Sequence, residues 1–175
     1  TWKSRGLGDV YKRQQEFNPQ GFTFSNDGTK MFLTGNNGDD VNEYTLSTGF
    51  DVSTASFVDS FDISSQEEGP RDLAFNADGT KMFVVGANGD AVDEWTLSTA
   101  YDISTLSHVG NYSVATNGTE ATPWGLSFND DGSKMFVSGD TTDKILEYHL
   151  STPFTISTAS YDSGFDLSGQ DATII

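Results

Sequence analysis

The sequence motif that decides the fold occurs three times: "NDGTKMF" at Asn26–Phe32, "NADGTKMF" at Asn76–Phe83 and "NDDGSKMF" at Asn129–Phe136. Glycine adopts positive φ without a Cβ clash, and Asn or Asp before it tolerates the same region. An Asp-Gly step between apolar segments therefore predicts a hairpin. The flanking residues alternate with a period of two, which indicates β-strands rather than helices. We expect one strand–turn–strand unit to be repeated along the chain.

The repeat extends well beyond this turn. Segments of similar sequence begin at Pro19, Pro70 and Pro123, at offsets of 51 and 53 residues. Each continues through a second Gly/Asp turn into a third strand, of which "VNEYTL" at Val41–Leu46 is the first copy. A Ser/Thr-rich loop and a fourth strand follow. Four antiparallel strands per repeat predict an all-β fold made of β-propeller blades.

The predicted blades lie near residues 19–69, 70–122 and 123–175. Propellers contain ~4–8 blades, so about three repeats form an incomplete ring. We expect either the rest of its own propeller or a second chain to close the ring. The Met and Phe of each repeated turn are expected to pack between neighbouring blades, because a blade is covered on both faces.

The first residues stand apart from this pattern. Ser4–Gln14, "SRGLGDVYKRQ", looks like a translated sequencing-library adaptor, so we interpret residues 1–14 as not native. This interpretation implies a partial metagenomic sequence whose propeller fragment spans residues 15–175. The last residues support it, because Phe165–Ile175 aligns with Phe61–Asp72 and stops where a fourth copy would begin.

The acidic composition excludes some classes of partner. The formal net charge is -17. Such a surface repels phosphate backbones and anionic lipid head groups, so we expect no nucleic-acid and no membrane partner. Thirteen Phe, six Tyr and three Trp argue for a folded chain, since aromatic side chains bury large areas. With no Cys there is no disulfide framework and no thiolate chemistry.

The segment "GLSFNDDGSKMFVSGD", Gly125–Asp140, and its two sister segments resemble the broad YVTN-type and lactonase-like β-propeller superfamily. The resemblance implies that ligands approach the central channel at one face. Two sets of loops form that face: those entering each innermost strand, and those joining the second and third strands. In this chain they are the loops 64–72 and 114–125 and the turns with Asp39, Asp90 and Asp140.

The position after each repeat proline varies, although a shared fold does not require variation there. Arg71 is expected either to grip an anionic group or to form a local ion pair with a neighbouring carboxylate. Trp124 is expected either to stack on a sugar or to close the channel as a packing residue. The candidate ligand-binding residues are Gln20, Glu67, Glu68, Arg71, Asp72, Glu120 and Trp124.

Carboxylates near the same face form a second candidate set. Oxygen-rich clusters suit Ca²⁺, and the alternative is a solvated acidic rim. The weak metal-binding candidates are Asp39, Asp40, Asp90 and Asp140. No catalytic residue is assigned, because His108 and His149 stand alone in predicted strands and no hydrolase or nucleotide-binding motif is present. Glu43, Glu94 and Glu147 recur at one strand position, which favours a structural role.

These observations favour a non-enzymatic binding or structural module of a larger secreted, cell-surface or virion protein. Its ligand is expected to be a carbohydrate or a protein. The alternative is a lactonase-type hydrolase with a divalent cation in the propeller channel, which the resemblance implies at the level of the fold alone. The sequence does not determine the location, for which we expect an extracellular, cell-surface or virion site.

Overall fold

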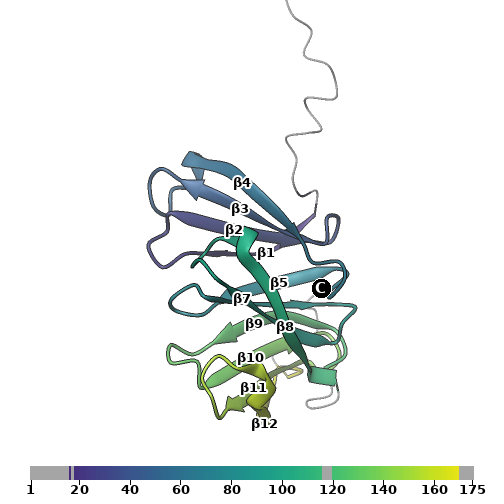
Figure 1. Cartoon of the computed structure of the whole chain (residues 1–175). Coiled ribbons are helices and arrows are strands. Elements are labelled where there is room, and N and C mark those ends of the chain that lie inside the picture. Colours follow the sequence, from purple (N-terminus) through teal and green to yellow (C-terminus); the bar gives the residue numbers. More distant parts are fainter. Residues whose placement is uncertain (1–15, 17, 116–119, 170–175) are drawn as a thin grey trace, which may run out of the picture.

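The computed structural model describes residues 16, 18–115 and 120–169. They form three four-stranded antiparallel sheets that follow one another in chain order (Figure 1). The strands of the first sheet are β1 (Pro19–Phe24), β2 (Lys30–Gly35), β3 (Asp40–Leu46) and β4 (Ala55–Asp62). Those of the second are β5 (Pro70–Phe75), β6 (Lys81–Gly86), β7 (Ala91–Leu97) and β8 (Leu106–Ser113). Those of the third are β9 (Pro123–Phe128), β10 (Lys134–Gly139), β11 (Lys144–Leu150) and β12 (Ala159–Asp166).

This arrangement confirms the predicted all-β fold of propeller blades. A 3₁₀ turn, absent from the prediction, precedes the fourth strand of each sheet: η1 (Val52–Thr54), η2 (Ile103–Thr105) and η3 (Ile156–Thr158). Within the described part of the chain, no helix is long and apolar enough to cross a membrane.

The repeated turn joins the first two strands of each sheet, as predicted. Asp27 Oδ1 accepts hydrogen bonds from the Thr29 amide (2.9 Å) and hydroxyl (2.8 Å). These bonds hold the pKa of Asp27 below its usual value. Gly28 has a φ of +70°, and a Cβ added there would lie 2.3 Å from the ring of Phe50. Each copy therefore needs glycine for its backbone conformation and for the aromatic ring packed on it.

The hydrophobic core lies between the sheets. Met82 and Phe83 are successive residues of β6, both 0% exposed, and they belong to two different clusters. Met82 lies in the cluster shared with the first sheet, where the Phe32 and Phe75 ring centroids are 4.5 Å apart. Phe83 lies in the cluster shared with the third sheet, 4.5 Å from the centroid of Phe128. The predicted packing of these side chains between blades is confirmed.

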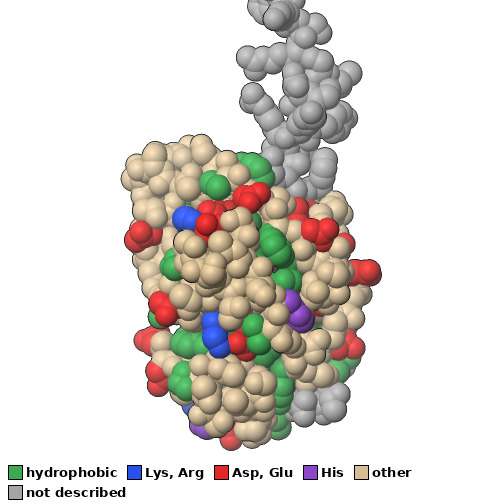
Figure 2. Space-filling view, viewed as in Figure 1, with side chains coloured by type: hydrophobic (Ala, Val, Ile, Leu, Met, Phe, Trp, Pro, Cys, Tyr) green, Lys and Arg blue, Asp and Glu red, His purple; other side chains and the backbone are tan. Residues whose placement is uncertain are grey.

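The first strands of the three sheets lie next to one another. β1 contacts β5, and β5 contacts β9. These are therefore the innermost strands of the three blades. On the face shown in Figure 2, acidic side chains are widely scattered and Lys and Arg are few.

Candidate functional site

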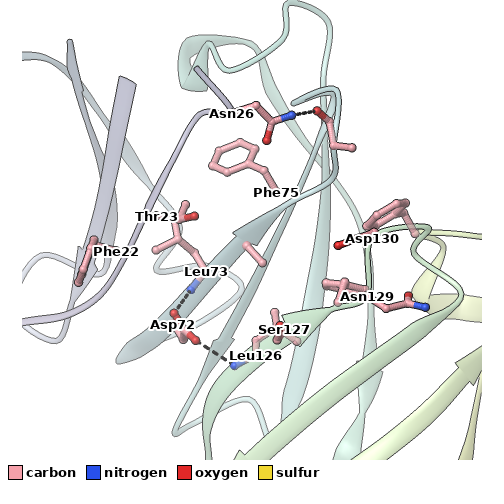
Figure 3. Close-up of a pocket in the computed structure, with 14 residues that line it drawn as sticks. Phe22, Thr23, Asn26, Asp72, Leu73, Phe75, Leu126, Ser127, Asn129 and Asp130 are labelled. Atoms are coloured by element: carbon pink, nitrogen blue, oxygen red, sulfur yellow. Dashed lines mark hydrogen bonds between the residues drawn. The ribbon is translucent and has the colours of Figure 1, made fainter. Parts of the chain in front are cut away.

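A groove of about 550 Å³ runs along the innermost strands β1, β5 and β9 (Figure 3). Its walls come from all three sheets and are both apolar and polar. The residues labelled in the figure are Phe22, Thr23, Asn26, Asp72, Leu73, Phe75, Leu126, Ser127, Asn129 and Asp130. The groove therefore occupies the place where a propeller carries its central channel.

Each innermost strand is irregular at the same point near its beginning. In β1 the register shifts between Pro19 and Gly21, and in β5 it shifts between Pro70 and Asp72. In β9 the partners jump from Gly125 to Pro123. The extra residues are Gln20, Arg71 and Trp124, the three variable positions that the sequence analysis selected. A bulge releases a residue from the ladder and re-aims its side chain, which explains why these positions tolerate different residues.

Two of these residues, from neighbouring blades, contact each other. The Arg71 guanidinium carbon lies 3.3 Å from the centroid of the Trp124 ring. Trp124 is 40% exposed, so the interaction lies at the protein surface. A cation over an indole ring is held by the ring's negative face. One face of the Trp124 ring is therefore covered by Arg71, and both roles expected for Trp124 stay predictions.

The positive charge of Arg71 is not compensated by any described residue. The local ion pair with Glu67, Glu68 or Asp72 is not formed, because the ion pairs between described residues do not include Arg71. Its Nε and Nη1 atoms are buried without a hydrogen-bond acceptor. An unpaired buried donor costs free energy, and a charged one costs more. Among the described residues, the one charged-group contact of this guanidinium is therefore the face of the Trp124 ring.

Both carboxylate oxygens of Asp72 accept hydrogen bonds from backbone amides. Its Oδ1 accepts from the Leu73 amide and its Oδ2 from the Leu126 amide, each at 2.9 Å (Figure 3). It thereby joins β5 to β9, and burial raises its pKa. At the equivalent position of the first sheet only glycine fits, since a Cβ on Gly21 would lie 2.6 Å from the Asp72 Cα.

Glu67 and Glu120 are buried beneath the turns between the second and third strands. Glu67 is 1% exposed and accepts from the amides of Asn88 (3.2 Å) and Gly89 (3.1 Å). Burial raises the pKa of Glu67 to about 7, although the two amides act in the opposite direction.

Glu120 is 0% exposed and has more donors. Thr122 and Thr141 donate their amides to Oε1, and Thr142 donates its amide and hydroxyl to Oε2. Burial acts to raise its pKa, but these hydrogen bonds together outweigh burial and lower it. Both carboxylates hold a turn, a role that the sequence analysis missed because their donors lie about 20 residues away.

The other candidates are spread over the loops. Asp39 Oδ1 accepts from the Gly69 amide (2.9 Å), and Asp40 accepts from Asn42 Nδ2 and Ser60 Oγ. Exposed residues among the candidates include Glu68 and Asp140, whereas Gln20 and Asp90 are half-buried. No group of three or more His, Cys, Asp or Glu among the described residues is placed to hold a metal ion. Calcium binding stays a prediction.

The histidines lie away from the groove. His108 Nε2 is 2.8 Å from Asp93 Oδ1 on the outer pair of strands, and its ring packs against Trp95. His149 is exposed on β11. Neither histidine lines the groove.

Sequence comparison with known proteins gives one short match. No family model matches the chain. Peroxidasin homolog pxn-1 of Caenorhabditis elegans is 34% identical over 74 residues, which cover 42% of this chain and 6% of that protein.

Several solved structures superpose on the chain. A candidate 6-phosphogluconolactonase from Bacteroides uniformis shares 16% identity at a TM-score of 0.61, covering 83% of this chain and 40% of that one. The periplasmic gluconolactonase PpgL of Pseudomonas aeruginosa shares 18% at 0.59, covering 85% and 39%. The Cps50 (Swd1) β-propeller domain of Myceliophteria thermophila shares 12% at 0.55, covering 85% and 43%. The fold is thus a β-propeller, and the chain spans about two fifths of the length of these structures.

Proposed function

We propose that this chain supplies three blades of a larger propeller that binds a small anionic ligand, of the sugar-acid class, at the contact between Arg71 and Trp124 on the bulges of β5 and β9. The observation that carries the proposal is the uncompensated charge of Arg71 on the bulge of β5. On a chain with a net charge of -17, such a cation is a local exception. A carboxylate or phosphate on the ligand supplies the acceptor that Arg71 lacks.

Trp124 adds a second element of recognition. Its ring forms an apolar platform next to the cation, and its exposed part remains available to the carbon skeleton of the ligand. Anchoring one charged end and one apolar face fixes the orientation of a small molecule. Because both residues belong to this chain, the binding test needs no other blade.

The test is a titration of the 175-residue chain with gluconate, 6-phosphogluconate and glucose, followed by calorimetry. We expect both anions to bind and 6-phosphogluconate to bind more tightly, because it carries more negative charge. Arg71→Gln is expected to weaken binding at least about tenfold, and Trp124→Ala to weaken it less. Lys144→Gln is the matched control, because it removes one positive charge from β11, which is separated from β9 by the strand β10. Equal binding of glucose, or equal loss in the Lys144 variant, would contradict the proposal.

Hydrolysis of a sugar lactone is a second candidate function. The names of the Bacteroides and Pseudomonas structures support it more than they support a non-enzymatic module. Arg71 is suited to orient the lactone, while Asp72 is held by two backbone amides and is not free to act as a base. The hydrolytic groups would come from the rest of the ring. Release of acid from gluconolactone in a pH-stat tests this function, and a rate equal to the uncatalysed background in a complete ring excludes it while leaving the binding proposal intact.

A further inference from the structure

Two kinds of buried glutamate recur in the blades, and the first kind is paired with a lysine. Lys30 Nζ donates to Glu43 Oε1 (2.7 Å) and to the Tyr101 carbonyl of the second sheet (2.5 Å). Glu43 Oε2 accepts from the Ile103 amide (3.1 Å). The structural role predicted for these glutamates is thereby explained, because the ion pair holds the backbone of the next blade. The second and third sheets repeat the contact through Lys81, Glu94, Phe154 and Ile156.

The second kind lies three residues before a repeat proline and has no lysine partner. Glu67 and Glu120 occupy this position, and neither belongs to an ion pair between described residues. A Cβ added to Gly86 would lie 2.4 Å from Glu67 Cδ, and one added to Gly139 would lie 2.4 Å from Glu120 Cδ. Each carboxyl group is therefore packed against the residue that ends the second strand of its blade. Hydrogen bonds are what stabilise its ionised form there.

Glu67 lacks two of the donors that Glu120 has, and the first is a hydroxyl. Thr142 donates both its amide (3.2 Å) and its hydroxyl (2.8 Å) to Glu120 Oε2. Gly89 occupies the equivalent place in the turn beside Glu67, and it donates its amide (3.1 Å) but has no side chain. The glycine therefore leaves the Glu67 carboxylate less stabilised than that of Glu120.

The second missing donor is taken by another carboxylate. The Thr122 amide, two residues after Glu120, donates to Glu120 Oε1 (2.9 Å). The corresponding amide after Glu67 belongs to Gly69, and it donates to Asp39 Oδ1 instead (2.9 Å). Asp39 precedes β3 of the first sheet, so the neighbouring blade removes a donor from Glu67 and adds a negative charge nearby.

The surroundings of Glu67 disfavour its ionised form. Burial raises the pKa of Glu67 to about 7 against the effect of its two amide donors, and the carboxylates of Asp93 and Asp39 act in the same direction as burial. His108 Nε2 lies 2.8 Å from Asp93 Oδ1, so this histidine is engaged by another carboxylate. The titratable side chains on the elements around Glu67 are Asp39, Glu68, Asp90, Asp93 and His108.

A short stretch of backbone links Glu67 to the proposed ligand site. Gly86, against which the carboxyl group packs, pairs with Pro70 of β5. The next residue is Arg71, on the bulge that follows this pair. A movement of the Glu67 carboxyl group away from Gly86 would therefore displace the backbone that carries the guanidinium.

We propose that Glu67 is a pH-sensitive latch on the Arg71 site. As the neutral acid it stays beneath the turn and keeps Arg71 on the face of Trp124; as the carboxylate it leaves the turn and releases the bulge. A neutral carboxyl group still accepts hydrogen bonds from amides, so the closed form contains no buried charge. The inference rests on the proposed function in one respect, that Arg71 binds the anionic group of the ligand.

The latch is closed at mildly acidic pH and opens as the pH rises. The closed turn favours protonated Glu67, whereas in the open turn the side chain is exposed to water and has its usual pKa of 4.5. Raising the pH therefore favours the open form. With pKa values of about 7 and 4.5, the ratio of closed to open turn falls about tenfold between pH 6 and pH 8.

The test is amide hydrogen exchange of the 175-residue chain, followed by NMR from pH 6 to pH 8 and corrected for the intrinsic rate at each pH. We expect the protection of the Asn88 and Gly89 amides, which donate to Glu67, to fall about tenfold over this range. The Thr141 and Thr142 amides, which donate to the equivalent carboxylate, are the internal control and should keep their protection. A fall shared by both pairs, or by neither, would overturn the proposal.

Two substitutions assign the effect to one carboxyl group. Glu67→Gln carries a neutral side chain of the same shape, so we expect protection that does not change with pH. Glu68→Gln removes the charge of the exposed neighbour and should keep the pH dependence of the wild type. If Glu67→Gln does not fold, the carbon resonance of the Glu67 carboxyl group in the wild type decides. A midpoint near 7 supports the latch, and one below about 5 overturns it.

Gluconate binding at pH 6 and pH 8 connects the latch to Arg71, because the gluconate carboxylate is ionised at both values. We expect the wild type to bind about threefold to tenfold more weakly at pH 8, and Glu67→Gln to bind equally at both. Equal binding by the wild type would overturn the proposal. Absence of binding at either pH would contradict the proposed function, and the indole resonance of Trp124 then tests the latch. A shift with pH in the wild type alone supports it, and no shift overturns it.

Discussion

In every blade the bulge and the repeated turn lie at the two ends of the innermost strand. The turn has nearly the same sequence in all three blades, whereas the bulge carries a different residue in each. All three turns contain Asp-Gly, one Thr or Ser, and then Lys-Met-Phe, whereas the three bulges carry Gln20, Arg71 and Trp124. The turn serves backbone conformation and packing between sheets, which every blade needs. The bulge residue lies outside the ladder, so the fold does not constrain it. The comparison separates residues that build the propeller from residues free to bind a ligand.

The largest loss of stability is expected when an aromatic side chain that follows the repeated turn, and packs between two sheets, is removed. Phe83→Ala removes a ring that is 0% exposed between the second and third sheets. We expect a loss of about 3–5 kcal/mol in the free energy of unfolding, measured with urea. Phe136→Ala is the control at the equivalent position of the third sheet, where the ring is only half-buried and a smaller loss is expected. Equal losses would show that burial between sheets does not govern the contribution.

A substitution in the turn should come next. In Gly79→Ala the added Cβ meets the Tyr101 ring at 2.3 Å and the residue must keep a φ of +71°. Left-handed backbone costs about 1–2 kcal/mol and the clash about as much again, so we expect a loss of roughly 2–4 kcal/mol. Gly110→Ala is the matched control, because a Cβ there meets nothing within 4 Å. A Gly79 variant as stable as the Gly110 variant would refute the role of the left-handed turn.

The two buried glutamates sharpen the comparison, because equivalent positions differ in the sign of their pKa shift. The folded-state pKa of Glu67 is raised from 4.5 to about 7, so folding favours its protonated form. Its contribution to stability is present at low pH and is lost as the pH rises from about 4.5 to 7. Glu120 has a lowered pKa, so its contribution is present above its usual pKa and is lost at lower pH.

We therefore expect Glu67→Gln to gain stability relative to the wild type between pH 5 and pH 8, by about 1–2 kcal/mol. Glu120→Gln should show no such gain in that window. Urea unfolding at four pH values measures both differences. The same rise for both variants would contradict the assigned shifts.

The smallest effect is expected at the bulge. Arg71→Gln removes a cation–π contact at a partly exposed ring, which contributes about 0.5–1 kcal/mol to stability. Thermal unfolding alongside the binding titration measures this effect. A loss above about 2 kcal/mol would make Arg71 a structural residue and would remove the contrast between turn and bulge.

Much of the fold was predictable because its signals are local. The Asp-Gly turns, the alternation of the strands and the repeat offsets lie within short stretches of sequence, and the structure places the strands close to the predicted residues. The site was predictable only in part. Arg71 and Trp124 were selected by their variation, but their contact joins residues 53 positions apart in two blades. The burial of Glu67 and Glu120 was missed, because no local pattern distinguishes a buried carboxylate from an exposed one.

The sequence by itself determined the blade: its turn, its four strands and the apolar residues that face both neighbours. These features follow from backbone sterics and side-chain alternation within each repeat, so they need no knowledge of the rest of the molecule. Only the tertiary structure decided which charges are neutralised and which are left without a partner. That outcome depends on the distances between segments far apart in the sequence. Asp72, Glu67 and the ion pairs Lys30–Glu43 and Lys81–Glu94 find backbone partners there, whereas Arg71, among the described residues, contacts only the face of Trp124.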